Sequence, residues 1–365
     1  MNIAIDIRSA EGRKAGKGVY TYNLIKNLIK IDKNNQYFLY CKNPDENSFN
    51  FPNVKLVKVK GSNIFWHLNA YFKIRKNKTD IFIATSSFII PFLLPKKIKT
   101  LLSVHDLVAI KFPSKHLKKA VLIEKLLLKS VVKKAYKILA VSQNTKNDLI
   151  KLVDTIKNKI EIIYCGVSEN FKTFNDYELK LAKNSNIVPD KYFLAVGTIE
   201  PRKNYLNLIY AFKLFLEKHP DFKLIVVGNK GWQYEKVFSE IKRLKLKERV
   251  VFPDYLPESG LLNLYNLSSA LVFPSFYEGF GIPPLEAMKC SCPVIASNSS
   301  SIPEVVGNAG IYIDPNKTKD IAKKMTLIIE DKKLREDLIM KGLKNVNRFT
   351  WENSAKKLYE IIKNI

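Results

Sequence analysis

Short runs of β-type residues alternate with amphipathic helical stretches along the chain, and no other feature constrains the fold as strongly. Strands separated by helices pair in parallel, because each helical crossover returns the chain to the same edge of the sheet. The chain has 365 residues, which is long for one hydrophobic core and sufficient for two. We therefore predict an α/β protein with two parallel, doubly wound sheets covered by helices.

Thirteen segments have the pattern of strands. They lie at 3–7, 37–40, 54–59, 80–84, 100–104, 138–141, 161–164, 192–196, 222–227, 249–252, 270–273, 293–296 and 310–313. The main helical patterns lie at 19–31, 64–76, 116–135, 143–152, 205–218, 235–244, 259–266, 284–289, 318–330, 333–346 and 351–362. In addition, Ser301-Ile-Pro-Glu304 predicts a capping box at the start of a short helix.

A polar, irregular stretch over residues 171–190 has no strand pattern, and we place the linker there. This division gives an N-terminal domain at 1–185, a C-terminal domain at 186–348, and a closing helix at 349–365 expected to pack back toward the N-terminal domain. Both domains are expected to be Rossmann-like. Such sheets bind ligands at the carboxyl ends of their strands, so the site is predicted in a cleft between the domains.

The chain carries 61 Lys and Arg against 34 Asp and Glu, and the excess is concentrated in its first half. Residues 1–185 have 34 basic and 14 acidic residues, for a net charge of +20. Residues 186–365 have 27 and 20, for a net charge of +7. A biased amino-acid usage would not favour one half so strongly, so the asymmetry indicates that the N-terminal half meets an anionic partner.

The sequence lacks the marks of a membrane-spanning or secreted protein. No apolar run approaches the roughly 20 residues that cross a bilayer, and Asp6 and Arg8 interrupt the apolar stretch at the N-terminus. The cysteines lack the spacing of a redox or zinc motif. They are Cys41, Cys165, Cys290 and Cys292. We expect buried, reduced thiols in a cytoplasmic protein.

The segment Gly197-Thr-Ile-Glu-Pro-Arg-Lys-Asn204 follows a strand and opens a helix. A helix that starts there presents free N–H groups and the positive end of its dipole to a ligand above the sheet. Arg202 and Lys203 add a planar guanidinium and a compact ammonium at the same place. Together they predict a diphosphate site, with two solvated surface cations as the alternative.

A second segment, Phe273-Pro-Ser-Phe-Tyr-Glu-Gly-Phe-Gly-Ile-Pro-Pro-Leu-Glu286, places Glu278 in a loop and Glu286 about one turn inside the next helix. The loop glycines let the backbone approach a ligand closely, and carboxylates accept hydrogen bonds from sugar or ribose hydroxyls. A glycosidase acid and base would also need two carboxylates, but it would not need a phosphate-binding segment. A capping Glu plus a turn Glu is the structural alternative.

These two segments, continued by Pro293-Val-Ile-Ala-Ser297 and Ser301-Ile-Pro-Glu-Val-Val-Gly-Asn-Ala-Gly310, resemble family 4 of the retaining glycosyltransferases. The resemblance is strong over the C-terminal half, where the first segment is most similar to mannosyltransferases, and weak over the N-terminal half. It implies a GT-B fold, with two Rossmann-like domains facing across a cleft, and no metal or other cofactor. The segment Pro253-Asp254-Tyr255 departs from the family, which usually has a Gly before the residues that frame the base.

The resemblance implies catalytic roles for four residues: His105, Arg202, Lys203 and Glu278. It implies donor-binding roles for eight others: Gly16, Lys17, Gly197, Gly279, Phe280, Gly281, Leu285 and Glu286. Arg202 and Lys203 would neutralise the donor diphosphate. Glu278 and the three amides after it would hold the donor sugar, and Glu286 would hold the ribose hydroxyls.

The N-terminal contributions depend more heavily on the resemblance. Gly16-Lys17-Gly18 follows the first strand but lacks the third glycine of a dinucleotide fingerprint. In a GT-B protein this loop faces the donor phosphates. A lone His at a strand end is usually structural, but the resemblance favours a contact of His105 with the donor sugar or the acceptor. Asp106 is either the partner that orients His105 or an acceptor contact.

The helical pattern over 116–135 carries Lys118, Lys125, Lys129 and Lys133 on one side. A solvated face is the usual explanation of such a stripe. Given the excess of positive charge in this half, docking on an anionic membrane explains it equally well, because each Lys near such a surface contributes about 1 kcal/mol. Members of the resembled family often act on lipid-carried acceptors.

The sequence therefore predicts a retaining glycosyltransferase that moves a hexose to a hydroxyl of a glycan or lipid-linked glycan in surface polysaccharide synthesis. GDP-mannose is the first choice of donor and a UDP-hexose the second. We expect it in the cytoplasm, where it can attach to the inner face of the plasma membrane. One rival is a basic nucleic-acid-binding protein, which leaves the Glu278–Glu286 segment unexplained. We therefore expect no nucleic-acid partner. The other is a non-catalytic nucleotide-sugar-binding protein of the same fold.

Overall fold

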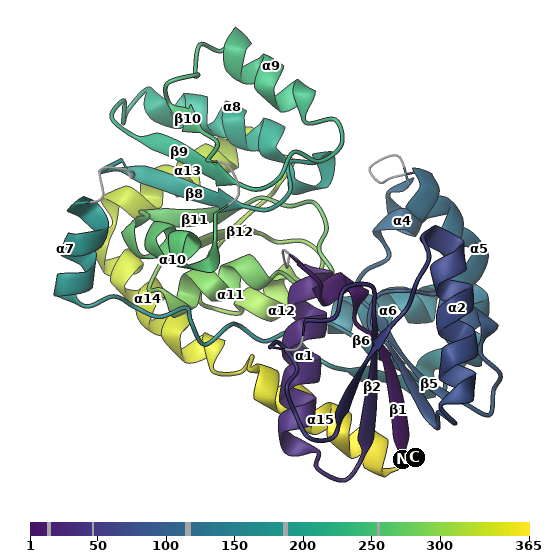
Figure 1. The fold of residues 1–365 in the computed structure, drawn as a ribbon. Helices are drawn as coiled ribbons and strands as arrows, with labels where there is room; N and C mark the ends of the chain where they lie inside the picture. Colours follow the sequence, from purple (N-terminus) through teal and green to yellow (C-terminus); the bar gives the residue numbers. More distant parts are fainter. Residues whose placement is uncertain (13–15, 46, 114–117, 185–188, 254–255) are drawn as a thin grey trace. The chain divides into compact units, whose positions relative to one another are not determined.

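The computed structural model describes residues 1–12, 16–45, 47–113, 118–184, 189–253 and 256–365. Contacts between residues divide the chain into two compact units (Figure 1). Unit 1 comprises Met1–Gly166 and Phe349–Ile365, and unit 2 comprises Val167–Arg348. Each unit contains one parallel sheet with helices on both faces, which confirms the predicted α/β class and the two Rossmann-like domains.

The sheet of unit 1 has seven strands in the order β3-β2-β1-β4-β5-β6-β7. They are β1 (Asn2–Asp6), β2 (Gln36–Cys41), β3 (Val54–Lys58), β4 (Ile81–Ala84), β5 (Lys99–Val104), β6 (Lys137–Ala140) and β7 (Ile160–Ile162). Each corresponds to a predicted strand. Most are apolar runs buried between two helical layers, which are distinctive in sequence, whereas β3 is only partly buried. The order reverses between β1 and β4, and their carboxyl ends form the switch point where doubly wound sheets bind ligands.

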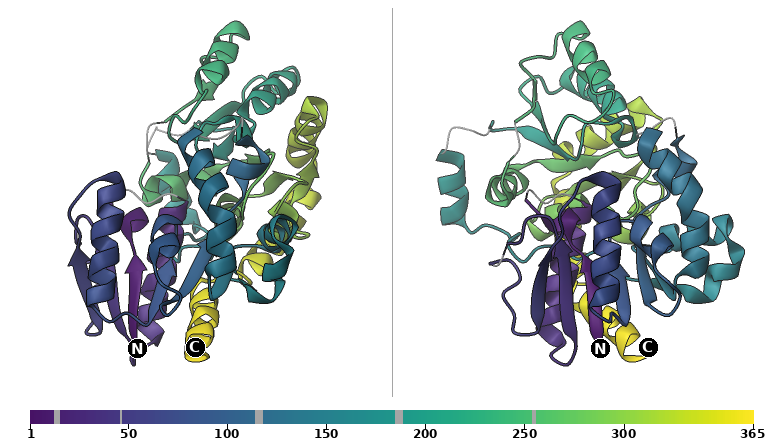
Figure 2. Two further views of the ribbon diagram at one scale, coloured as in Figure 1. Left: turned by 90° about the vertical axis from the view of Figure 1, so that its right-hand side faces the viewer. Right: turned by 45° about the vertical axis from the view of Figure 1, so that its right-hand side comes forward.

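Two groups of helices cover the faces of this sheet (Figures 1 and 2). On one face, α1 (Lys17–Ile31) packs against α15 (Trp351–Lys363). The helices that share the core of the other face are α2 (Asn63–Lys76), α3 (Ile89–Leu93), α5 (Lys118–Lys134) and α6 (Gln143–Leu152). The short α3 and α4 (Val108–Lys111) were not predicted, because neither is long enough to show a helical period.

The sheet of unit 2 has the order β10-β9-β8-β11-β12-β13, so its switch point lies between β8 and β11. Its strands are β8 (Tyr192–Val196), β9 (Lys223–Val227), β10 (Val250–Val251), β11 (Ala270–Phe273), β12 (Val294–Ser297) and β13 (Ile311–Ile313). Its helices are α7 (Asp176–Asn184), α8 (Tyr205–Leu216), α9 (Glu235–Arg243), α10 (Glu258–Leu267), α11 (Ile282–Lys289), α12 (Ile302–Val306), α13 (Thr318–Glu330) and α14 (Lys332–Val346).

The boundary between the units differs from the predicted one. The chain divides at Gly166–Val167, about 19 residues before the predicted division at 185/186. The stretch taken for a linker contains α7, which packs against α10. The chain before α7 is also fixed to unit 2, where the Phe174 amide donates to the Asn266 side chain at 2.8 Å. A polar surface segment has no apolar pattern, so the sequence could not distinguish it from a linker.

The closing segment belongs to unit 1, where the Ser354 hydroxyl of α15 donates to the Tyr164 carbonyl at 2.7 Å. All four cysteines are buried and free, as predicted. Within the described ranges, no helix is long and apolar enough to cross a membrane.

Candidate active site

Two loops of unit 2 meet at the switch point between the neighbouring strands β8 and β11. One covers residues 197–204 after β8, and the other covers residues 274–281 after β11. The Phe276 amide of the second loop donates to the Arg202 carbonyl of the first at 2.9 Å. Both segments singled out in the sequence therefore lie at the place where a doubly wound sheet binds its ligand.

The first loop carries its two cations in a short 3-10 turn. Arg202 and Lys203 lie in the turn Pro201–Lys203, and α8 begins two residues after Lys203, at Tyr205. The segment therefore opens a helix at Tyr205, as predicted, and the 3-10 turn that holds the cations was not predicted. Proline at the first position of the turn fixes its backbone, so the side chains are positioned by the turn and by the partners described below.

Asn204 connects the two loops. Its backbone is left-handed, with a φ of 62°, a conformation that Asn tolerates better than most residues. Its buried side-chain amide donates to the Pro274 carbonyl at 3.0 Å and to the Pro315 carbonyl at 2.7 Å. The hydrogen bond to Pro274 joins the two loops, and the one to Pro315 fixes Asn204 to the segment that follows β13.

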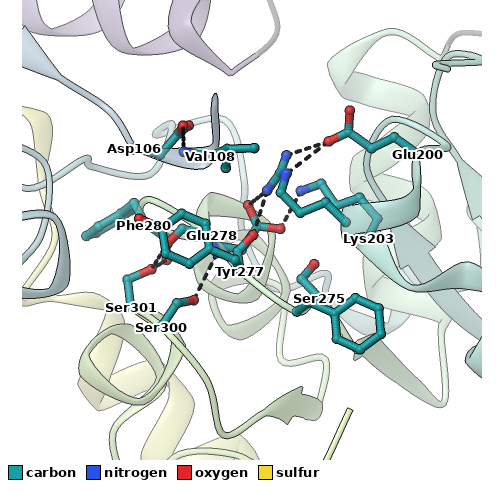
Figure 3. Close-up of polar contacts among 12 residues, drawn as sticks. Asp106, Val108, Glu200, Lys203, Ser275, Tyr277, Glu278, Phe280, Ser300 and Ser301 are labelled. Carbon is teal, nitrogen blue, oxygen red and sulfur yellow. Dashed lines mark hydrogen bonds and ion pairs between the residues drawn. The ribbon is translucent and has the colours of Figure 1, made fainter. Parts of the chain in front are cut away.

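The cations of the first loop are paired with carboxylates (Figure 3). Arg202 Nη1 donates to Glu278 Oε2 at 2.6 Å and to the Tyr277 carbonyl at 2.8 Å, and Lys203 Nζ donates to Glu278 Oε1 at 2.6 Å. On its other side, Arg202 Nη2 donates to Glu200 at 2.6 Å. Each oxygen of Glu278 thus accepts from a different cation. Glu200, which was not predicted as a site residue, completes the cluster.

Burial and charge act in opposite directions on Glu278. Burial alone would raise the pKa of this carboxyl, because only 7% of the residue is exposed. The adjacent Arg202 and Lys203 outweigh burial and lower the pKa to about 2. Burial also lowers the pKa of Lys203, and Glu278 opposes that shift. Glu278 is therefore ionised at neutral pH, and its charge depends on the two cations beside it.

Serine hydroxyls hold the backbone around Glu278 (Figure 3). The Glu278 amide donates to Ser300 Oγ at 2.9 Å, and Ser301 Oγ donates to the carbonyls of Glu278 at 3.0 Å and Phe280 at 2.7 Å. The predicted capping box is thus wrong. Helix α12 does follow Ser301, but the Ser301 side chain makes no N-terminal cap. Its hydroxyl instead supports the loop of Glu278, a long-range role that a local motif does not reveal.

Glu286 lies in α11 and has its own partner. Tyr265 donates to Glu286 Oε2 at 2.8 Å. Burial raises the pKa of Glu286 to about 7, and the hydrogen bond from Tyr265 opposes only part of that shift. This carboxyl is therefore poised to exchange a proton near neutral pH. Tyr265 was not anticipated, because it is 21 residues away in the sequence.

The predicted backbone contacts of the donor lie in the same loops. Gly281 caps α11 with a φ of 113°, in the region that favours glycine. Gly279 and Phe280 are buried. Leu285 has no exposed surface, so its side chain does not face a ligand directly. Gly197 has a φ of 145° and lies against Lys203. Asp254 and Tyr255, which frame the predicted base pocket, lie outside the described residues.

A close contact between Gly228 and Gly197 was not predicted from the sequence. A Cβ atom on Gly228, which follows β9, would lie 2.0 Å from the Gly197 carbonyl oxygen. No side chain fits at that distance. The loop after β9 therefore packs directly against the loop that carries Arg202 and Lys203.

In unit 1, His105 follows β5, and a backbone carbonyl holds its ring. Its Nε2 lies 2.7 Å from the Thr85 carbonyl, which can only accept, so Nε2 carries the proton. Burial, followed by the charge of Lys17, lowers the pKa of His105 to about 4. The partner that orients His105 is therefore the Thr85 carbonyl. Asp106 instead accepts from the Val108 amide at 3.0 Å, so the alternative that Asp106 orients His105 is not supported.

Three other residues of unit 1, Gly16, Lys17 and Arg8, follow β1 in the chain. Gly16 and Lys17 are exposed at the start of α1, which begins two residues earlier than predicted. Arg8 follows β1, pairs with Asp6 at 2.6 Å, and lies over the Trp66 ring at 3.5 Å. Arg8 was predicted only as a charge that interrupts an apolar run, since its stacking partner is remote in sequence.

Comparison with known proteins gives a consistent result. The family model "Glycosyl transferases group 1" matches residues 176–345, and "Glycosyltransferase Family 4" matches residues 15–171. The chain is 32% identical over 265 residues to the O-antigen chain mannosyltransferase B of Escherichia coli, covering 72% of this chain and 70% of that protein. It is also 32% identical over 224 residues to the serotype-specific mannosyltransferase WbdA of Escherichia coli, covering 60% of this chain and 27% of WbdA, so it spans about a quarter of that longer relative.

Among solved structures, HepE from Anabaena in complex with UDP and glucose superimposes with a TM-score of 0.80 at 17% identity, covering 100% of this chain and 99% of HepE. The two parallel sheets and this superposition show the GT-B fold. With the matches to both family models and the first relative, the chain belongs to family 4 of the glycosyltransferases.

Proposed function

We propose that this chain is a retaining hexosyltransferase that moves mannose from GDP-mannose to a hydroxyl of a glycan or lipid-linked glycan in surface polysaccharide synthesis. The names of the two relatives support mannose and the O-antigen context. The UDP and glucose bound to HepE support a nucleotide-diphosphate sugar as the general class of donor. The observation that carries the proposal is the Arg202–Lys203–Glu278 cluster at the switch point of unit 2.

The cluster suggests how the donor is held. Arg202 and Lys203 are balanced by Glu278 and Glu200, so the four side chains have no net charge. We propose that the donor diphosphate replaces Glu278 at Arg202 Nη1 and Lys203 Nζ. The released Glu278 oxygens then accept hydrogen bonds from sugar hydroxyls. One exchange of partners would thus engage both the diphosphate and the sugar.

We propose the following reaction. The bond between the sugar C1 and the diphosphate oxygen breaks, and a bond from the acceptor oxygen to C1 forms on the same face. The proton of the acceptor hydroxyl passes to the departing diphosphate. Arg202 and Lys203 stabilise the charge that develops on that diphosphate, which is the largest contribution expected in such a site. The proposal requires no metal, and unchanged transfer in a chelator is its expected result.

In unit 1, His105 and Asp106 are the proposed contacts to the transferred sugar and the acceptor. With its proton on Nε2, His105 keeps a lone pair on Nδ1 that can accept from a hydroxyl. We also propose that the protein works in the cytoplasm and takes its nucleotide-sugar donor there. Its basic half is proposed to contact an anionic membrane. Dividing the charges at the observed boundary gives unit 1 a net charge of +21 and unit 2 a net charge of +6.

Thermal unfolding in the presence of GDP, UDP, ADP or an oligonucleotide tests the class and the base together. The proposal predicts stabilisation by GDP above the other three. A preference for UDP would replace GDP-mannose by a UDP-hexose, and stabilisation by the oligonucleotide alone would favour the nucleic-acid-binding rival. Binding of GDP-mannose with neither transfer nor hydrolysis would favour the non-catalytic rival.

A further inference from the structure

We propose that the outer faces of α2, α3 and α5 in unit 1 form one surface that inserts apolar side chains into the interface of an anionic lipid bilayer. We call it the docking surface. Its apolar members are Ile64, Phe65, Leu68, Phe72, Phe92, Leu122 and Leu126. Among the described residues, these are seven of the fourteen exposed large apolar side chains, on helices that make up about a tenth of the chain.

Helix α2 is apolar on both sides. Trp66, Ala70 and Ile74 have no exposed surface and pack in the core of the sheet. On the outer side, Phe65 is 66% exposed and Phe72 is 63% exposed, and their spacing of seven residues places them on one stripe. A helix of a water-soluble domain normally has a polar outer side, so the folding of unit 1 does not explain the outer stripe of α2.

Helices α3 and α5 extend the surface. Helix α3 contacts both α2 and α5, and Lys134 of α5 donates to the Phe92 carbonyl of α3 at 2.6 Å. On α5, Leu122 and Leu126 are 59% and 66% exposed. Figure 2 shows α2 and α5 on the same side of the unit 1 sheet. The three helices therefore present a continuous face rather than scattered apolar residues.

The charge of the same helices favours an anionic bilayer over a protein partner. Residues 63–76, 89–93 and 118–134 hold nine Lys and Arg and one acidic residue, Glu124. Lys125 and Lys129 are exposed beside Leu126, as is Lys133 farther along α5. The side chain of Lys118 lies outside the described residues. A second copy of the chain would bring an equal positive charge to this face, which opposes self-association. Lipid headgroups supply the negative charge, and the acyl region accepts the Phe and Leu side chains.

The position of the surface suits a lipid-carried acceptor. Helices that follow parallel strands begin at the carboxyl edge of the sheet. The first turns of α2 and α5 therefore lie toward the edge where His105 follows β5. The docking surface specifies the membrane contact of the proposed function, and both it and this link to the acceptor rest on that function. Vesicle binding is measured without donor or acceptor, so its failure and the failure of transfer are separate results.

Flotation of the purified chain with vesicles tests the proposal. One set contains phosphatidylcholine alone, and the other contains about 30% phosphatidylglycerol, an anionic lipid. Wild type should float with the second set and not with the first. The variant Phe65→Ser/Phe72→Ser/Leu126→Ser and the variant Lys125→Glu/Lys129→Glu/Lys133→Glu should each bind at least about tenfold more weakly.

Matched changes on unit 2 provide the controls. Met340→Ser/Leu343→Ser removes exposed apolar side chains from α14, and Lys319→Glu/Lys323→Glu/Lys333→Glu reverses three exposed lysines of α13 and α14. Both should bind like wild type. In a further variant, Phe72→Trp, lipids brominated in the acyl chains should quench the new fluorescence.

The proposal would be overturned by no binding of wild type to anionic vesicles, by equal binding of the Ser variant and wild type, or by unquenched fluorescence of Phe72→Trp. A wild-type dimer in sedimentation that the Ser variant dissociates would identify a second copy as the occupant, and would also overturn it. Circular dichroism of every variant separates these outcomes from misfolding.

Discussion

Lys203 and Glu278 are 75 residues apart in the sequence, and their side chains meet at 2.6 Å at the switch point of the unit 2 sheet. The two strands that precede them, β8 and β11, are neighbours in that sheet. The ion pair therefore exists because the strand order reverses there. This reversal brings together two loops between which the described chain forms α8, β9, α9, β10, α10 and β11. We expect this pair to be the point at which the donor is recognised.

The serine that supports the loop gives a first prediction. Ser301→Ala removes the donor to the carbonyls of Glu278 and Phe280, and should lower the free energy of unfolding by about 1–3 kcal/mol, because buried carbonyls lose their partner. Donor affinity should fall as well. Urea unfolding and calorimetry with GDP measure the two effects. Ser239→Ala, an exposed serine in α9, is the control, and equal behaviour of both variants would contradict the role of Ser301.

The contact between Gly228 and Gly197 gives a second prediction. Gly228→Ala places a methyl group 2.0 Å from the Gly197 carbonyl, so the loop with Arg202 and Lys203 must move. Transfer activity should fall by at least about tenfold, since displacement of positioning groups is costly. Gly260→Ala is the control, because the nearest atom to its new Cβ lies at 3.4 Å. Wild-type activity in Gly228→Ala would show that the contact is unimportant.

Glu286 should make stability depend on pH. Burial raises its pKa from 4.5 to about 7, so between these values the folded state binds a proton that the unfolded state releases. The stability contributed by this proton is present at low pH and is lost as pH rises through 7. Relative to Glu286→Gln, wild type should lose about 2 kcal/mol of unfolding free energy between pH 5 and pH 8. Urea unfolding at both pH values measures this difference, and parallel profiles would contradict the shift.

His105 should stay neutral over the working range. Its pKa is lowered to about 4, chiefly by burial, so its charge should not change between pH 5.5 and pH 8. The ring proton resonances of His105, assigned by comparison with His105→Asn, should therefore remain constant over that range in NMR spectra. The associated loss of stability should appear only as pH falls below 6.5 toward 4. A midpoint near 6.5 would contradict the effect of burial on this ring.

The sequence predicted the strands and the main helices because each is determined by a local apolar period. It also selected Arg202, Lys203 and Glu278 through residue type and order along the chain. It did not find Glu200, Ser300 or Tyr265 as partners, because those contacts depend on which strands become neighbours. Local rules also failed where a tertiary contact was stronger, as at Ser301, whose hydroxyl supports a loop rather than a helix.

The most direct test is isothermal titration of GDP-mannose into wild type, Lys203→Ala and Glu278→Ala, each paired with a sugar-transfer assay. We predict that wild type binds and transfers mannose. Both variants should retain their circular dichroism and lose transfer by at least about a hundredfold. Lys213→Ala, an exposed lysine of α8, should match wild type. Full binding and transfer in Lys203→Ala or Glu278→Ala would contradict the assignment of this cluster as the donor site.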